Sequence, residues 1–135
     1  MENKTSSVIC NINYHIVFCP KYRKAVLKGD IKKFLETCFE TIAETKGWKI
    51  HEFKVMPDHI HLFLSPHPYD SPTAIVKILK GVSALQLFKR FPELKQELWN
   101  GHIWSPSYYV GTAGKVSADT IERHIREQER NSSTV

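Results

Sequence analysis

The chain has 135 residues, of which 41% are hydrophobic and 11% aromatic, and it carries a net charge of +5 with a pI near 9.1. This length and composition predict one globular domain over residues 1–135. No apolar stretch approaches the roughly 20 residues that a membrane-spanning helix needs. The polar start also lacks the apolar core of an export signal, so we expect a cytoplasmic protein with no membrane partner. The basic charge favours a polyanionic partner such as a nucleic acid.

Strand and helix signals alternate in the first half of the chain. Residues 8–19 are rich in β-branched and aromatic side chains and stop at a proline, which predicts a strand. Apolar residues then recur at helical spacing from Asp30 until Gly47, which predicts a helix. Residues 48–55 and 59–64 flank a Met-Pro-Asp segment, and we expect an antiparallel pair of strands joined by a tight turn.

The second half continues the alternation. Ser71 as N-cap and Pro72 at the first helical position predict a helix that ends at Phe91. Its expected inner face comprises Ile75, Ile78, Leu79, Val82, Leu85 and Phe88. A short helix over 94–98, a strand-forming segment over 102–112 and a last helix from Ser117 to about Arg130 follow. The order βαββαβα predicts an α+β fold of the ferredoxin-like or RRM-like kind: an antiparallel sheet with helices on one face, followed by a C-terminal helix.

A pair of histidines stands within the apolar segment MPDHIHLFL. His59 and His61 project from the same face of the predicted strand because alternate residues share a face, so the two imidazoles can chelate a metal. The alternative is a pair of partly exposed histidines on the open side of the sheet. The chain is too short for a metal-dependent amidohydrolase barrel, and Phe63 stands where a third alternating histidine would be needed. A metal that serves nucleic-acid chemistry remains.

Five ordered segments carry a resemblance that covers nearly the whole chain. They are VFCPKYRK (17–24), VMPDHIHLFL (55–64), LKGVSALQLFKRFPELK (79–95), LWNGHIWSPSYYVGT (98–112) and TIERHIREQ (120–128). Together they resemble the small HUH tyrosine transposases called TnpA and their REP-associated relatives, which act on single-stranded DNA of insertion sequences.

The resemblance implies a metal site and a substrate. In that family the His-hydrophobic-His motif, here His59 and His61, binds a divalent metal, usually Mg²⁺ or Mn²⁺, and a glutamine matching Gln128 completes the protein ligands. The metal polarises the scissile phosphate. A tyrosine one helical turn before that glutamine is the nucleophile and forms a 5′-phosphotyrosine link. The implied working unit is a homodimer whose last helix is catalytic, and the implied substrate is single-stranded DNA with a hairpin near the element end.

The nucleophile position departs from this pattern, because His124 stands where the family has its tyrosine. An imidazole has no hydroxyl, so it cannot form a phosphotyrosine, and we expect cleavage to be impaired. His124 and Gln128 are one-turn neighbours on the predicted last helix. Several interpretations stay open: an engineered variant that captures uncleaved DNA, a natural descendant that only binds, an extra nitrogen ligand that favours zinc, nickel or copper, attack through a phosphoramidate, or a helix histidine resting on the sheet.

Basic residues with an interleaved aromatic ring predict the DNA-binding surface. We expect its contacts to come from Lys21, Tyr22, Arg23, Lys24, Lys80 and Arg90. The alternative for the segment PKYRK is an ordinary solvated loop. A second class of function also stays open: a non-catalytic nucleic-acid-binding module, such as a domesticated transposase.

Overall fold

The structure is a computed structural model that describes residues 3–5, 8–10, 12–97 and 101–112. In chain order, its elements are β1 (Asn3–Thr5), β2 (Val8–Cys10), β3 (Tyr14–Phe18), the 3-10 turn η1 (Lys21–Arg23), α1 (Asp30–Lys46), β4 (Lys49–Met56), β5 (His59–Ser65), α2 (Pro72–Arg90), α3 (Leu94–Glu97) and β6 (Tyr109–Gly111). No helix among these described elements is both long and apolar enough to cross a membrane.

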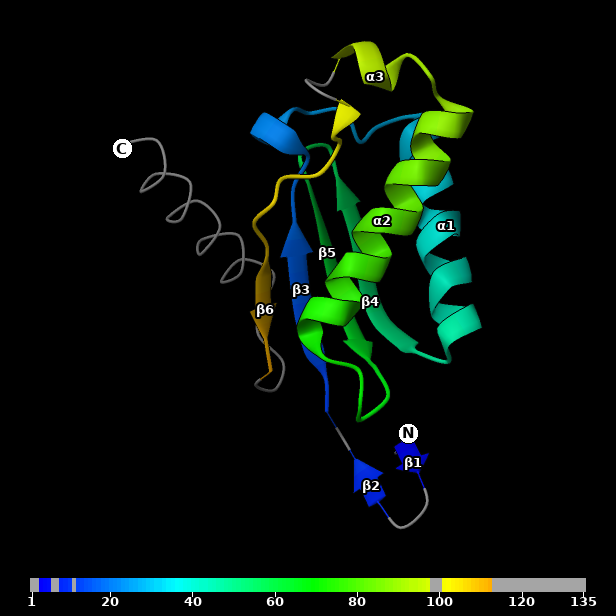
Figure 1. Cartoon of the computed structure of the whole chain (residues 1–135), viewed down its shortest axis with the longest axis vertical. Coiled ribbons are helices and arrows are strands. Elements are labelled where there is room, and N and C mark those ends of the chain that lie inside the picture. The colour runs from blue at the N-terminus through cyan, green and yellow to red at the C-terminus, as the bar shows by residue number, and fades with distance from the viewer. Residues whose placement is uncertain (1–2, 6–7, 11, 98–100, 113–135) are drawn as a thin grey trace, which may run out of the picture.

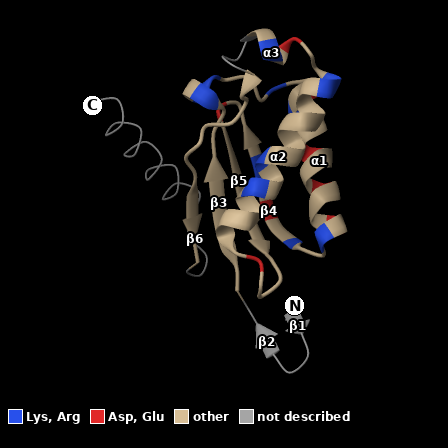
Figure 2. Ribbon diagram, viewed as in Figure 1, with Lys and Arg blue, Asp and Glu red and all other residues tan. Residues whose placement is uncertain are grey.

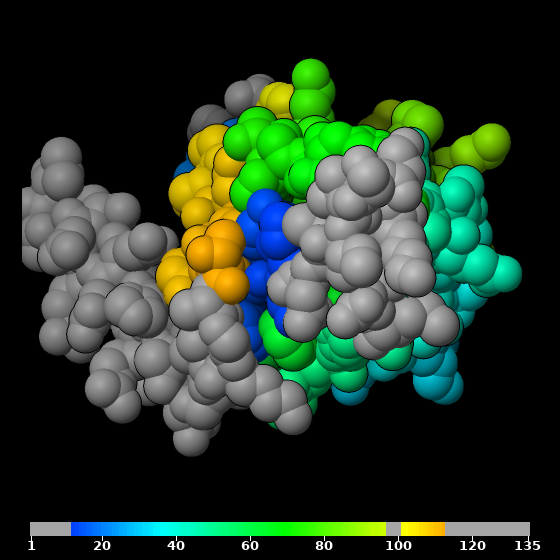
Figure 3. Space-filling view, turned by 90° about the horizontal axis from the view of Figure 1, so that it is seen from below, coloured from blue at the N-terminus to red at the C-terminus, as the bar shows by residue number. Residues whose placement is uncertain are grey.

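Four strands form the main sheet in the spatial order β4-β5-β3-β6, and every neighbouring pair is antiparallel. Both long helices, α1 and α2, lie over one face of this sheet (Figure 1). This arrangement confirms the predicted α+β fold of the ferredoxin-like kind. Seen from the end where β3 begins, β6 packs directly beside the start of β3 (Figure 3), in agreement with the pairing of Gly111 with His15.

The helix boundaries follow their predicted signals. α1 ends at Gly47, which adopts the left-handed conformation with φ of 74° that glycine reaches without steric cost. At the start of α2, the Ser71 side chain accepts a hydrogen bond of 3.1 Å from the backbone N–H of Ala74. The helix stops at Phe91, before a proline that cannot continue it. The predicted last helix lies outside the described residues.

The prediction of one strand over residues 8–19 is wrong. The segment is divided into β2, which pairs with β1 in a separate two-stranded sheet, and β3, which joins the main sheet. Asn13 lies between the two strands and is not itself in a strand, and asparagine disfavours strand backbone. Of residues 8–19, only β3 therefore belongs to the main sheet, which carries the histidines.

The prediction that Leu85 faces the core is also wrong, since its side chain is 72% exposed. The buried stripe of α2 instead runs through Ile75, Val76, Leu79, Ser83 and Leu87. Leu85 lies about 160° around the helix from Ser83, at about 100° per residue. The apolar pattern predicted the wrong inner face at this point because the buried stripe of α2 contains a polar residue, Ser83. The Ser83 hydroxyl donates to the carbonyl of Leu79 at 2.6 Å and accepts from Trp104 Nε1 at 2.9 Å, so its burial is satisfied.

The hydrophobic core lies between the sheet and the two long helices. The sheet contributes Ile16, Phe18, Ile60, Leu62 and Leu64, and the helices contribute Leu35, Phe39, Ile75 and Leu79. Phe18 meets the Trp104 indole edge-on, with ring centroids 4.8 Å apart. In β5 the even-numbered residues fill this core, so the odd-numbered residues, including both histidines, point to the opposite face.

We predict that Leu79→Ala lowers the free energy of unfolding by roughly 2–5 kcal/mol, because Leu79 is only 1% exposed and its loss leaves a cavity. The matched change Leu85→Ala on the same helix should alter it by less than about 0.5 kcal/mol. Urea denaturation of both variants measures the difference. Equal losses would show that the burial of α2 is not as described.

Candidate metal centre and nucleic-acid interface

Three imidazoles gather on the sheet face that points away from α1 and α2. His59 and His61 come from β5, and His15 comes from the neighbouring β3. The register places Val17 opposite His61 and His15 opposite Phe63. Nδ1 of His15 lies 3.5 Å from Nε2 of His61, and the His15 ring stacks on Phe63 with centroids 4.2 Å apart. Exposed fractions of 1%, 6% and 4% for His15, His59 and His61 rule out the alternative of partly exposed histidines.

His61 has the properties of a metal ligand. Burial lowers its pKa, and the charges of Lys54 and the neighbouring histidines add to this effect against the opposing charge of Glu52. The imidazole is therefore neutral at physiological pH and keeps a nitrogen lone pair. Its Nδ1 is buried and has no hydrogen-bond partner among the described residues. A buried nitrogen in this situation is costly unless something binds it.

The His59 ring is oriented by the residue before it. Its Nδ1–H donates to Oδ1 of Asp58 at 2.9 Å, and the other carboxylate oxygen of Asp58 lies 2.9 Å from Nε of Arg23. Burial alone would raise the pKa of the Asp58 carboxyl, but the hydrogen bond from His59 and the charge of Arg23 outweigh it and hold that pKa below its ordinary value. Asp58 is therefore a charged acceptor, and a neutral His59 that donates through Nδ1 carries its lone pair on Nε2.

Two neighbouring imidazoles fit a divalent transition-metal ion such as Mn²⁺ better than a cation that takes only oxygen ligands. Within the described ranges, no group of three or more His, Cys, Asp or Glu side chains could hold a metal. The predicted third ligand, Gln128, and the neighbouring His124 lie outside the described residues. The described residues therefore offer His59 and His61 as candidate metal ligands and no third one.

The segment predicted to contact DNA forms the tight turn η1. Tyr22 and Arg23 both adopt left-handed backbone conformations, with φ of 59° and 53°. The Tyr22 ring is 65% exposed, and the ammonium group of Lys21 lies 5.5 Å from its centroid. An exposed ring beside a cation can stack on a base while the cation meets phosphate. Arg23, in contrast, is engaged with Asp58.

A groove of about 670 Å³ separates α2 from the segment before β6. Lys21 and Lys80 both line it, together with Lys77, His102, Trp104 and Tyr108. Arg90 and residues 22–24 are not among its lining residues. Lys and Arg residues lie at η1, in the middle of α2 and near its C-terminal end (Figure 2).

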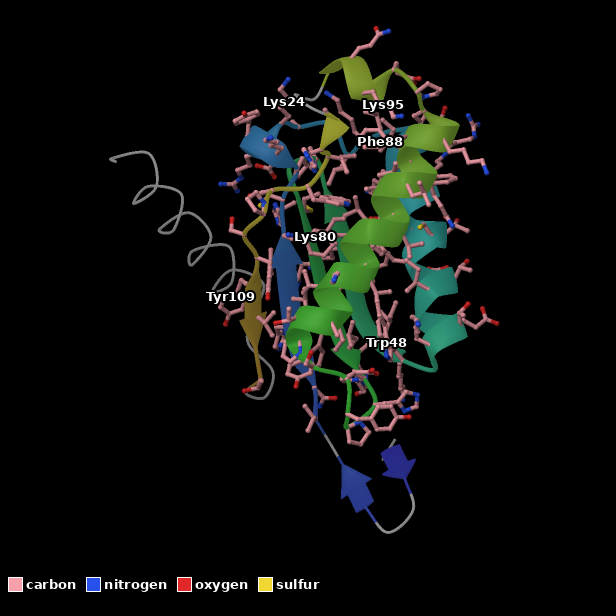
Figure 4. All side chains as sticks on the ribbon, in the orientation of Figure 1. Lys24, Trp48, Lys80, Phe88, Lys95 and Tyr109 are labelled. Atoms are coloured by element: carbon pink, nitrogen blue, oxygen red, sulfur yellow. The ribbon has the colours of Figure 1, made fainter. Side chains whose placement is uncertain are left out.

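The Lys80 side chain makes contacts within the fold. Its ammonium group donates to the carbonyls of Ser105 at 2.6 Å and Ser107 at 3.2 Å, and it lies between α2 and the segment before β6 (Figure 4). Burial lowers the pKa of this lysine, with an opposing effect from Cys19. The ammonium group is also 5.2 Å from the centroid of the Tyr108 ring. Lys80 therefore links the two sides of the groove, α2 and the segment before β6.

Residues 8–128 match the family described as "Transposase IS200 like". The chain belongs to this family. It is thus a transposase of the insertion-sequence type, in a family whose activity is DNA cleavage and strand transfer during transposition. The HUH tyrosine-transposase resemblance of its motifs is confirmed at the level of the family.

Relatives support the assignment over most of the chain. It is 37% identical to the ISDra2 transposase TnpA of Deinococcus radiodurans over 93% of this chain and 89% of that protein. It is 36% identical to the transposase for insertion sequence element IS200 of Salmonella typhimurium, over 87% of this chain and 77% of that protein. A crystal structure of a D. radiodurans protein described as a transposase matches with a TM-score of 0.84 and 35% identity, over 93% and 97% of the two chains.

A more distant structure shares the fold. It is a REP-associated tyrosine transposase bound to a REP hairpin, with a TM-score of 0.56 and 14% identity over 92% of this chain and 68% of that one. At this identity the likeness supports the architecture of the sheet and helices alone.

Two neighbours of the histidine pair were not anticipated from the sequence. His15 is brought beside His61 by the pairing of β3 with β5, which local patterns do not reveal. Asp58 was interpreted only as a turn residue, although an acidic residue directly before a ligand histidine is a usable signal, because metal-binding imidazoles commonly donate to carboxylates.

We predict that Lys80→Ala lowers the free energy of unfolding by about 1–2 kcal/mol, because two carbonyls lose a charged donor. Lys77→Ala removes the same charge from an exposed position almost one helical turn earlier and should leave stability unchanged. Thermal and urea unfolding of the two variants measure the effect. If both variants are as stable as the parent, Lys80 has no structural role.

Proposed function

We propose that this transposase binds single-stranded DNA with a hairpin near an insertion-sequence end and holds a divalent cation, Mg²⁺ or Mn²⁺, with His59, His61 and Gln128. The observation that carries the proposal is the buried Nδ1 of His61, which has no hydrogen-bond partner in the described part of the chain, next to a His59 ring oriented by Asp58. A purely structural histidine pair has no need of a buried, unsatisfied nitrogen.

In this proposal, separate groups of side chains bind the metal and the DNA. His59 and His61 hold the cation through imidazole nitrogens, and Gln128 adds an amide oxygen. When bound, the cation polarises the scissile phosphate. Lys21 and Lys24 neutralise DNA phosphates, and the exposed ring of Tyr22 stacks on an unpaired base. Lys80 shapes the groove and Arg90 contributes a more distant positive charge. The family resemblance supports a homodimer as the working unit.

His124 limits the chemistry of this chain. Strand cleavage in tyrosine transposases transfers the 5′-phosphate from the DNA to a tyrosine hydroxyl, and the 3′ oxygen of the DNA leaves. Histidine at position 124 has no hydroxyl to accept that phosphate. We therefore infer that the chain binds and aligns DNA at its metal site but forms no phosphotyrosine through residue 124.

A second candidate function, a non-catalytic nucleic-acid-binding module, is favoured by His124 itself. The two candidate functions differ in whether the protein binds a metal cation. A binding module without a cation would leave the Nδ1 of His61 buried and unsatisfied, whereas a metal-dependent transposase uses it. Metal binding therefore separates the two candidates better than DNA binding, which both share.

We predict that the full chain binds Mn²⁺ and that His61→Ala abolishes this binding, because one of the two imidazole ligands is lost. Isothermal titration calorimetry measures the affinity. His102→Ala, which removes an exposed histidine from the groove rather than from the sheet face, is the matched control and should retain the site. An absence of Mn²⁺ binding in the parent chain would favour the non-catalytic module.

We predict that the chain forms no covalent adduct with a hairpin-bearing single strand in the presence of Mn²⁺, and that His124→Tyr gains one. The tyrosine hydroxyl supplies the missing nucleophile. Denaturing gel electrophoresis of labelled DNA detects the adduct. His124→Phe has the tyrosine ring without its hydroxyl and should stay inactive. A metal-dependent adduct in the unmodified chain would refute the inferred impairment.

A further inference from the structure

Arg23 was predicted to contact DNA, but the structure gives it another partner. We propose that Arg23 is a positioning residue for the metal site: it holds the carboxylate of Asp58, which in turn fixes the ring of His59 so that Nε2 is the nitrogen that meets the cation. This inference rests on the proposed metal site. It assigns to the basic turn a role in metal affinity that is separate from DNA binding.

The carboxylate of Asp58 is shared between an ion pair with Arg23 and a hydrogen bond from His59, while Nε of Arg23 forms no hydrogen bond among the described residues. Oδ2 lies 2.9 Å from Nε of Arg23, and Oδ1 accepts from Nδ1 of His59 at 2.9 Å. Because one oxygen is held by an ion pair and the other by a hydrogen bond, the carboxylate plane cannot rotate without breaking one contact. The ring of His59 is therefore held by a chain of contacts that begins at Arg23.

The backbone around Arg23 fixes where its side chain begins. Tyr22 and Arg23 are successive non-glycine residues with positive φ, a conformation that costs on the order of 1–3 kcal/mol per residue and persists only where surrounding contacts impose it. Those contacts are present. Arg23 N–H donates to the carbonyl of Pro20 at 2.8 Å, and Lys21 N–H donates to the carbonyl of Ile103 at 2.7 Å.

A second contact ties the loop after η1 to the turn that carries Asp58. The backbone N–H of Leu27 donates to the carbonyl of Pro57 at 3.0 Å. Leu27 is itself fully buried in the core. Arg23 and Asp58 thus lie on two loops that are joined by a backbone hydrogen bond. Their ion pair therefore does not depend on side-chain conformation alone.

The competing role for Arg23 is a phosphate contact. The side chain of Arg23 is 25% exposed and that of Asp58 is 34% exposed, so DNA can approach the pair. A phosphate bound to Arg23 would have to share it with the carboxylate. The two roles predict different losses: positioning lowers metal affinity in the absence of DNA, whereas a phosphate contact lowers only DNA affinity.

The test uses the full chain without DNA and two measurements. Calorimetry with Mn²⁺ gives the metal affinity of the parent, Arg23→Ala, Arg23→Lys and Asp58→Ala. Ring ¹⁵N chemical shifts of His59, recorded without metal at a pH where these shifts themselves show a neutral ring, report which nitrogen carries the proton. Lys28→Ala is the matched control, since it removes a positive charge from an exposed position in the loop after η1.

We expect Asp58→Ala to weaken Mn²⁺ binding by roughly 10- to 100-fold and Arg23→Ala by about 3- to 10-fold, with Arg23→Lys between Arg23→Ala and the parent. His59 should carry its proton on Nδ1 in the parent chain and as a mixture of tautomers in Arg23→Ala. Lys28→Ala should match the parent in both measurements.

The outcomes separate the inference from the metal site on which it rests. If Arg23→Ala keeps the Mn²⁺ affinity and the His59 tautomer of the parent, the inference is overturned, whether or not DNA binding weakens. If the parent binds no Mn²⁺ but Arg23→Ala still releases the His59 tautomer, positioning of His59 by Arg23 is supported while the proposed metal function fails. Loss of affinity in both Arg23→Ala and Lys28→Ala would show a general charge effect and overturn the inference.

Discussion

The antiparallel pairing of β3 with β5 is the constraint on which the candidate site depends. It sets Val17 opposite His61 and His15 opposite Phe63, so that three imidazoles share the sheet face away from the helices while Ile16, Ile60 and Leu62 fill the core on the other side. Because side chains alternate along a strand, a slip of one residue in β5 would move both of its histidines into the core and its leucines out of it. The hydrophobic core therefore protects the register of the site.

The two ends of the short segment from Asp58 to His61 favour different charge states: Asp58 is ionised and His61 is neutral. Burial favours the neutral form of His61, whose pKa is lowered. Asp58 is nearer the surface, where a hydrogen bond from His59 and the charge of Arg23 keep it ionised. One turn and the first residues of β5 thus place a charged carboxylate near the neutral imidazole of His61. That combination suits a cation, since His61 need not lose a proton to bind it and the carboxylate supplies nearby negative charge.

The basic residues of the chain do not act as one class. Lys80 is bound to two backbone carbonyls and joins α2 to the segment before β6, and Arg23 is bound to Asp58. Lys77 and Arg90 are exposed on α2, where they remain accessible to a polyanion. A net charge of +5 indicates a nucleic-acid partner, but only the contacts distinguish cations that maintain the fold from cations that can meet phosphate.

The sequence by itself determined α1, α2 and α3, the β4–β5 pair, the fold class and the family, because caps, periodicity and ordered motifs are local signals. It misassigned Leu85, since a buried serine satisfied by Trp104 interrupts the apolar stripe, and it joined β2 to β3, because strand propensity does not reveal which partner a strand will choose. It identified His59 and His61 as neighbours on one face from alternation alone. Only the tertiary structure decided that His15 lies beside His61 and that Arg23 holds Asp58. Those contacts join residues 46 and 35 positions apart, and such pairings are set by sheet register and loop packing rather than by any local pattern.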